Sequence, residues 1–189
     1  HIDTQIVFYS LMPALLVLIL LLSASGAHAK NADSENQNFV NLITSCSNKI
    51  QKDFKKEDIV PIELVLAQSI LESNWGKSRF AKKGNNYFGI RTWDSERAQL
   101  KPLKRPDADF GLVVYRYPCD SVADYLDNLN TSDKYVTFRK IRQLEIALWG
   151  QVDPIRLASG LKQYSEQRAD YVKKIKRKIA LIKKKKYTN

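Results

Sequence analysis

Residues 59–76 read IVPIELVLAQSILESNWG. From Ile59 to Leu71, polar side chains occur only at Glu63, Gln68 and Ser69. Pro61 favours the start of a helix, and a helix that is apolar almost all round lies inside a protein rather than on its surface. Glu72 then stands at the end of a buried helix. Because a carboxylate in such a place is costly unless it is protonated, paired or functional, Glu72 is either a paired structural residue or a reactive one.

The segment after Glu72 is rich in amides, aromatic rings and glycines. It contains SNWG at 73–76, RFA at 79–81 and GNNYFGI at 84–90. Aromatic rings can stack on the faces of sugars, and amides can hydrogen-bond to sugar hydroxyls. This composition indicates a sugar-binding cleft, and ordinary loop chemistry is the alternative interpretation.

Histidine is absent from most of the chain. The 189 residues include two histidines, His1 and His28, and both lie within the first 29 positions. The remainder therefore excludes Ser–His–Asp and Cys–His catalysis, and two cysteines without a histidine argue against a catalytic zinc site. We expect no metal and no cofactor, so that any proton transfer must come from Asp, Glu, Tyr or Lys.

The first 29 residues predict an export signal. The run Ile6–Leu22 is apolar except for Ser10, and Ala27-His28-Ala29 is a pattern that signal peptidases cleave. The run is short for a bilayer span. We expect a cleaved signal peptide, with an uncleaved inner-membrane anchor as the alternative, and in both cases a periplasmic protein. The first residue is not Met and no Lys or Arg precedes the run, so we expect the natural chain to start further upstream.

The whole chain has 31 basic and 20 acidic residues, a net charge of +11. Residues 162–189 alone carry eleven basic and two acidic side chains. This basic segment is either a solvated helix face or a surface for anionic envelope polymers and lipid headgroups. Because the protein is expected to be exported, we expect no nucleic-acid partner. The oligomeric state has no signature in the sequence.

Hydrophobic spacing predicts the other elements. We expect a loose connector over 30–37, and two strands that form a hairpin around a turn at 106–111. Cys46 and Cys119 either form a disulfide or remain two buried thiols. The predicted strands cover residues 99–105 and 112–117, and the predicted helices include 39–54, 120–129, 134–148, 154–163 and 171–182.

Several motifs together resemble a known family. They are Ala67-Gln68, Leu71-Glu72-Ser73-x-Trp75-Gly76, Ser78-Arg79-Phe80-Ala81 and Gly84-Asn85-Asn86-Tyr87-Phe88-Gly89. These motifs resemble the bacterial peptidoglycan glucosaminidase domain of glycoside hydrolase family 73. Further matches at Lys104-Arg105-Pro106-Asp107 and Leu161-x-x-Tyr164-Ser165 are most similar to the Bax-type proteins of Gram-negative bacteria.

The resemblance implies an α+β fold, mainly α: a lysozyme-like helical domain with a small β-hairpin lobe. It implies that Glu72 is the general acid, which agrees with its place at the end of an apolar helix, where desolvation raises a carboxyl pKa. A second carboxylate is expected on the hairpin, where Asp107 is favoured over Asp109. The residues expected to bind substrate are Trp75, Asn85, Asn86, Tyr87, Phe88 and Tyr164.

The predicted domain organisation is a leader over 1–29, a connector and first helix over 30–58, a catalytic domain over 59–182 and a basic tail over 183–189. The predicted function is hydrolysis of the β-1,4 bond after N-acetylglucosamine in peptidoglycan glycan strands. The nucleophilic water is activated by a hairpin Asp, or the substrate's acetamido group participates. The alternatives are a lytic transglycosylase and a non-catalytic, cationic wall-binding module.

Overall fold

The computed structural model describes residues 12–185 and 187, with side chains described from residue 31 onward. Residues 1–11 of the predicted leader therefore lie outside the described residues. For residues 12–29 of the leader, the side chains are not described. In the basic tail, residues 186, 188 and 189 also lie outside them. Across the described part of the chain, no helix combines the length and the apolar character needed to cross a membrane.

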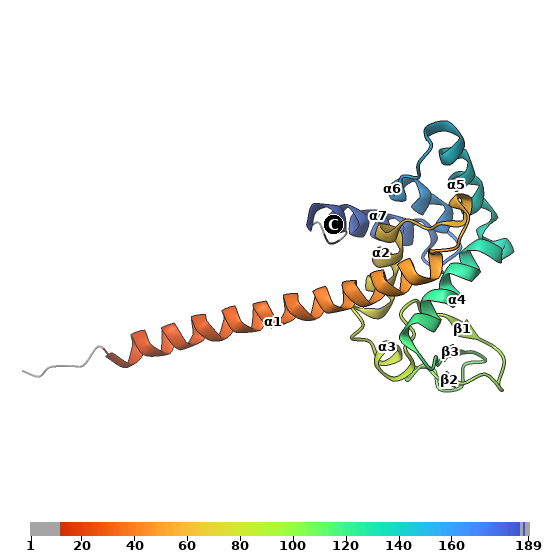
Figure 1. Ribbon diagram of the computed structural model, residues 1–189. Helices are drawn as coiled ribbons and strands as arrows, with labels where there is room; N and C mark the ends of the chain where they lie inside the picture. The colour runs from red at the N-terminus through yellow and green to blue at the C-terminus, as the bar shows by residue number, and fades with distance from the viewer. Residues whose placement is uncertain (1–11, 186, 188–189) are drawn as a thin grey trace, which may run out of the picture. The chain divides into compact units, whose positions relative to one another are not determined.

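The chain divides into two compact units, His1–Asn38 and Phe39–Asn189. The second unit is mainly helical, with a small sheet beside α3 and with α5 and α6 away from that sheet (Figure 1). The helices of the chain are α1 (Met12–Gln51), α2 (Ile62–Ser73), α3 (Arg79–Gly84), α4 (Pro118–Thr131), α5 (Val136–Trp149), α6 (Pro154–Leu157) and α7 (Arg168–Lys185), with 3-10 turns η1 (Lys56–Asp58), η2 (Asp133–Tyr135) and η3 (Ala158–Leu161).

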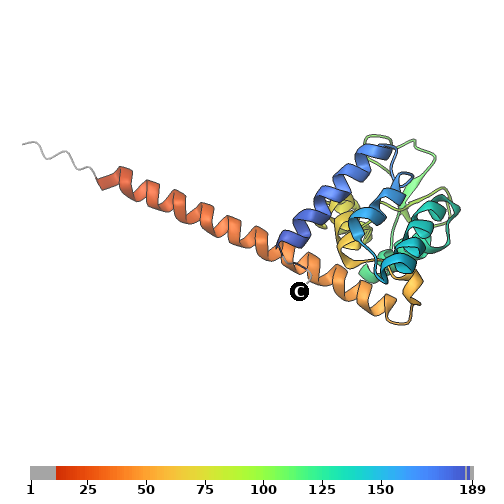
Figure 2. The ribbon, with the colours of Figure 1, turned by 90° about the horizontal axis from the view of Figure 1, so that it is seen from above.

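Helix α2 is the buried central helix that its sequence predicts. Its residues from Leu64 to Ile70 are all buried, and it packs most extensively against α7, which runs alongside it in Figure 2. Helix α7 contributes the buried side chains of Tyr171, Ile175 and Ile179 to the same core. The removal of this apolar surface from water is the main source of the unit's stability.

The sheet has three short antiparallel strands in the order β1-β3-β2. They are β1 (Arg91–Thr92), β2 (Gln99–Leu100) and β3 (Gly111–Val113). The predicted hairpin is therefore present, but its strands are shorter than expected. Pro102 has no N–H for pairing, and Tyr115 N–H donates to Gly84 O at 2.9 Å instead of continuing a ladder. Strand β1 is too short to produce an alternating pattern.

Two further expectations are decided by the structure. Cys46 of α1 and Cys119 of α4 form a disulfide, with their Cα atoms 5.1 Å apart. The expectation of a loose connector over 30–37 is wrong, because these residues belong to helix α1. The segment contains no Gly or Pro, and its polar residues do not by themselves stop a helix.

Candidate active site

Glu72 lies in the last turn of α2, immediately before a sharp reversal of the chain. Asn74, Trp75 and Gly76 all have left-handed backbone angles, with φ of 49°, 59° and 72°. Ser73 Oγ donates to Ser69 O at 2.6 Å and accepts from Gly76 N–H at 2.8 Å. The segment that follows the glutamate is thus a turn that ends the helix and leaves Glu72 at its exit.

Burial raises the pKa of the Glu72 carboxyl above its usual range. A hydrogen bond from Tyr171 and the positive charge of Arg91 act in the opposite direction, but burial is the largest effect. Gly89 lies against the carboxyl, since a Cβ at that position would stand 3.1 Å from Glu72 Oε2. Gly89 also has a φ of 66°, so any side chain there would be strained as well as crowded. The carboxyl therefore favours its protonated form at a higher pH than a free glutamate.

The loop that carries Gly89 is held by Asn86. This buried side chain donates to Ile90 O at 2.9 Å and to Val113 O at 3.0 Å, and it accepts from Ile90 N–H at 3.0 Å. Asn85 similarly donates to Tyr115 O at 3.0 Å. The two amides expected to bind substrate thus use their hydrogen bonds within the protein, where they bring the loop against Glu72.

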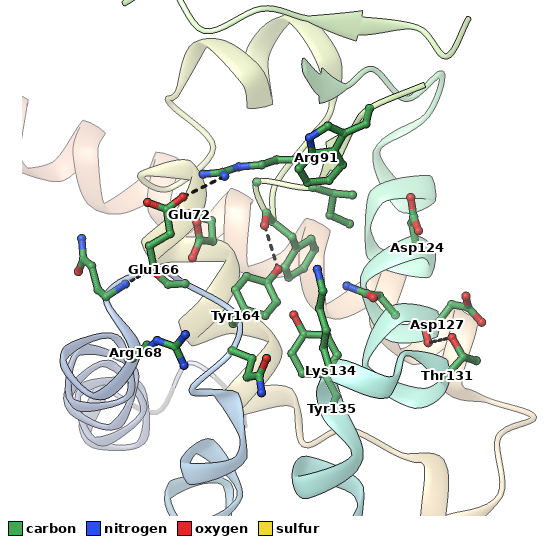
Figure 3. Close-up of a pocket in the computed structure, with 18 of the residues that line it drawn as sticks. Glu72, Arg91, Asp124, Asp127, Thr131, Lys134, Tyr135, Tyr164, Glu166 and Arg168 are labelled. Carbon is green, nitrogen blue, oxygen red and sulfur yellow. Dashed lines mark hydrogen bonds and ion pairs between the residues drawn. The ribbon is translucent and has the colours of Figure 1, made fainter. Parts of the chain in front are cut away.

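A pocket of about 730 Å³ opens in front of Glu72. Its walls come from α2, the segment Phe88–Arg91, α4, η2 and the chain before α7. Figure 3 shows Glu72 on the same side as Arg91 and Glu166, whereas Asp124 and Asp127 project from α4 on the other side. The lining is strongly polar, and its carboxylates, amides and hydroxyls are groups that can hydrogen-bond to sugar hydroxyls.

Three of the predicted site residues meet in this pocket, namely Glu72, Phe88 and Tyr164. Phe88 is buried and stacks on Tyr125, with ring centroids 4.0 Å apart. The Tyr164 hydroxyl donates to Phe88 O at 2.9 Å. These two aromatic residues form a rigid wall next to the acid.

The other predicted residues do not line the pocket. Trp75 and Tyr87 pack edge-on against Phe39, at centroid distances of 6.4 and 5.8 Å. Asp107 and Asp109 are exposed on the loop between β2 and β3. Their catalytic role therefore stays a prediction, and it requires that loop to approach the pocket.

Besides Glu72, the pocket is lined by three carboxylates that sequence reasoning missed, Asp124, Asp127 and Glu166. Asp124 accepts a hydrogen bond from the Tyr115 hydroxyl at 2.6 Å and pairs with Arg97 at 2.8 Å. Asp127 follows one turn later and is exposed. Both belong to a polar stripe of α4 whose three- and four-residue spacing could have revealed a common face. That stripe consists of Asp124, Asp127, Asn128 and Thr131.

Trp93 also lines the pocket, and the sequence suggested no role for it. Its side chain is 60% exposed, and its ring lies 5.9 Å from that of Phe110. A large aromatic ring left open to solvent at a polar pocket is a natural platform for a sugar ring. Among the residues with described side chains, no cluster of His, Cys, Asp and Glu is arranged to hold a metal ion.

The fold corresponds to that of a known glycoside hydrolase domain. The glycoside hydrolase domain of Salmonella typhimurium FlgJ has a similar structure, with a TM-score of 0.54 and 18% identity over 79% of this chain and 98% of that domain. The model of the glucosaminidase family, described as mannosyl-glycoprotein endo-beta-N-acetylglucosaminidase, matches residues 47–185. The chain belongs to this family, and the expected lysozyme-like class is confirmed.

Two curated relatives show the extent of the similarity. Protein bax of Escherichia coli (strain K12) is 29% identical over 117 residues, which are 62% of this chain and 41% of that protein. Exo-glucosaminidase LytG of Bacillus subtilis (strain 168) is 37% identical over 78 residues, or 41% of this chain and 27% of that protein. The matched segments thus span less than half the length of either relative.

Proposed function

We propose that the protein is an exported glucosaminidase that hydrolyses the β-1,4 bond after N-acetylglucosamine in peptidoglycan, with Glu72 as the general acid. The main support is the position of Glu72, a carboxyl with a burial-raised pKa at the wall of a polar pocket. Membership of the glucosaminidase family supports the substrate class.

In the proposed reaction Glu72 donates its proton to the glycosidic oxygen as the bond from that oxygen to the anomeric carbon breaks. A water molecule then supplies the new hydroxyl on the anomeric carbon and loses its proton. Either a second carboxylate takes up that proton from the attacking water, or the substrate's acetamido oxygen first attacks the anomeric carbon. In the second case water then opens the resulting ring and gives its proton to the Glu72 carboxylate, which restores the acid. Asp107 and Asp109 are the proposed bases. Asp124 is less suited, because its carboxylate already contacts the Tyr115 hydroxyl and Arg97.

The decisive experiment is digestion of purified sacculi followed by mass spectrometry of the product ends. We expect free reducing ends on N-acetylglucosamine. Glu72→Gln should reduce the rate at least a hundredfold, as loss of general acid catalysis does. Glu63→Gln, at the other end of α2, is the matched control and should retain activity. Equal activity of Glu72→Gln and wild type would refute the assignment.

The same product analysis separates the alternatives. Anhydro-muramoyl ends would show a lytic transglycosylase. Retention on sacculi without any cleavage by the wild type would show a binding module. Slow cleavage by Asp107→Asn or Asp109→Asn, with unchanged affinity for the glycan, would identify the base. Full activity of both variants would exclude a single hairpin Asp as the base and would favour acetamido participation.

We also propose that α7 holds the protein on an anionic envelope surface. The apolar side of α7 is buried in the core, and its outer side exposes basic residues that include Lys174 and Arg177. Such a face attracts anionic polymer through charge and does not insert deeply into lipid. The double variant Lys174→Gln with Arg177→Gln should weaken binding to sacculi at low salt. The control is the double variant Lys52→Gln with Lys55→Gln, which changes two exposed residues outside α7 and should weaken binding less.

Export remains part of the proposal, and the disulfide supports it because disulfides persist in oxidising compartments. Expression with residues 1–29 in place, followed by mass measurement of the periplasmic protein, tests it. A mature chain that begins at Lys30 is expected. The full mass in the membrane fraction would show the anchored form, and a cytoplasmic protein would contradict export.

A further inference from the structure

A chain of buried polar side chains from α4, α2 and α7 leads to Glu72. The Tyr125 hydroxyl donates to Gln68 Oε1 at 2.6 Å, and Gln68 Nε2 donates to the Tyr171 hydroxyl oxygen at 2.9 Å. Tyr171 is in turn hydrogen-bonded to the Glu72 carboxyl. Gln68 and Tyr125 are completely buried, and Tyr171 is 3% exposed. Polar groups this deep are costly unless every one is satisfied, so their arrangement is specific.

The orientation of the Gln68 carboxamide determines which group donates in the hydrogen bond between Tyr171 and Glu72. Its oxygen already accepts from Tyr125, so the amide presents an N–H to Tyr171, and the Tyr171 oxygen acts as the acceptor. The Tyr171 proton is then directed away from Gln68, and Glu72 is the acceptor to which Tyr171 is hydrogen-bonded. Burial raises the pKa of Tyr171 well above its usual value, so the hydroxyl keeps this proton throughout the working range of pH.

We propose that Gln68 and Tyr171 are positioning residues for Glu72. Gln68 fixes the Tyr171 hydroxyl as a donor, and this donor occupies one carboxyl oxygen so that the acidic proton is carried on the other. This inference rests on the proposed role of Glu72 as general acid. It adds two residues, one preceding Glu72 by a single helical turn and one from the last helix, that do not line the pocket themselves.

The arrangement assists both states of the acid. Before proton transfer, the Tyr171 hydrogen bond removes one of the two places where the proton could reside. After transfer, the same hydrogen bond stabilises the carboxylate that has formed. It thereby offsets part of the desolvation that raises the pKa of Glu72. Without it, the carboxyl would be a weaker acid and a less well oriented one.

The test is Tyr171→Phe, which removes the hydroxyl and keeps the aromatic ring. In the wild type this ring stacks on Tyr164, with the ring centroids 5.6 Å apart. We expect the alkaline limb of the pH–kcat profile to move up by about one pH unit, as the loss of one hydrogen bond to a charged group predicts. We also expect kcat at the wild-type optimum to fall about tenfold, with KM changed less than twofold. Titration of the Glu72 carboxyl by carbon NMR should show the same upward shift without substrate.

Gln68→Met tests whether Gln68 acts through Tyr171. Alone it should shift the profile in the same direction, and combined with Tyr171→Phe it should add little, since Gln68 acts on Glu72 only through the Tyr171 hydroxyl. Ser69→Ala is the matched control. It deletes a neighbouring buried hydroxyl on α2 that bonds Leu66 O, and it should leave the pH profile unchanged.

The outcomes separate this inference from the proposed function. If wild type cleaves glycan but neither the alkaline limb nor the NMR titration moves in Tyr171→Phe, the positioning role is overturned. Additive effects of the two substitutions would overturn the role of Gln68. If wild type cleaves no glycan, the proposed function fails, and the NMR titration still decides whether the Tyr171 hydroxyl supports the carboxylate. Circular dichroism verifies folding, and Gln68→Met carries the same readouts if Tyr171→Phe does not fold.

Discussion

At the scale of single residues, Glu72 shows the conflict between stability and chemistry. Burial opposes its ionisation, because water that would solvate the charge is excluded. The backbone of Gly89 lies so near the carboxyl that a side chain there would crowd it. A hydrogen bond from Tyr171 offsets part of the effect of burial on the Glu72 pKa. In the folded protein, the Glu72 carboxyl is therefore stabilised in its protonated form and destabilised in its charged form.

The raised pKa predicts a pH-dependent cost in stability. Between the pKa of the unfolded chain and the higher pKa of the folded one, the folded state binds more protons, so its stability falls as pH rises. Glu72→Gln should therefore raise Tm at pH 8, by about 2–4 °C for each kcal/mol recovered, and the difference should vanish near pH 4. Thermal unfolding at both pH values measures this. Glu96→Gln, an exposed carboxyl, is the control, and a lower Tm for Glu72→Gln at pH 8 would contradict the prediction.

Trp93 gives a second prediction at this scale. Trp93→Ala should weaken the binding of chitin oligosaccharides about 3- to 10-fold, the range expected for one aromatic stacking contact, with little change in Tm because the side chain is 60% exposed. Calorimetry on a Glu72→Gln background avoids turnover. Trp149 is similarly exposed at 55% but lies against Arg156 outside the pocket. If Trp149→Ala weakened binding as much as Trp93→Ala, the stacking role would be wrong.

At the scale of elements, the loop between α3 and β1 connects the sheet to the acid. Its shape depends on side-chain amides, since the Asn86 side chain bonds both the N–H and the C=O of Ile90 and also the C=O of Val113 in β3. A short sheet with few ladder bonds cannot hold such a loop alone. The amides replace the missing backbone pairs, and the result is a glycine placed next to the Glu72 carboxyl.

Asn86→Ala should reduce both stability and activity. Three hydrogen bonds are lost, including the one that pairs the Ile90 N–H, at a cost of roughly 2–3 kcal/mol, and the displaced loop should lower kcat more than tenfold. Denaturant unfolding and glycan digestion measure the two effects. Asn130→Ala removes a carbonyl contact between α4 and Asp58 and should lower stability without lowering kcat. Normal turnover by Asn86→Ala would show that the loop does not position the site.

At the scale of the whole molecule, the disulfide ties α1 to the start of α4 across 73 residues of sequence. A cross-link over such a long loop restricts the unfolded chain and contributes about 4 kcal/mol in the chain-entropy model. Cys46→Ser with Cys119→Ser should therefore lower Tm by roughly 8–16 °C. Reductant should lower the Tm of wild type and leave that of the variant unchanged. A wild-type Tm insensitive to reductant would contradict this prediction.

The sequence by itself determined the features that depend on neighbouring positions. The apolar pattern of residues 59–71 predicted the buried helix, and the end of that pattern singled out Glu72. The absence of histidine after residue 29 restricted acid–base chemistry to other side chains. Helices α4, α5 and α7 follow from their hydrophobic spacing, because helical periodicity is a local property.

Only the tertiary structure decided which side chains contact Glu72 or share its pocket. Tyr171 is 99 positions away from it in sequence, and Asp124 is 52 away, distances over which no periodicity operates. Asn86 and Trp75 carry side chains suited to sugars, yet the fold uses them for a loop and for packing. Residue type shows what a side chain can bind. Which partner it meets depends on long-range packing, and that is why the pocket became visible only in three dimensions.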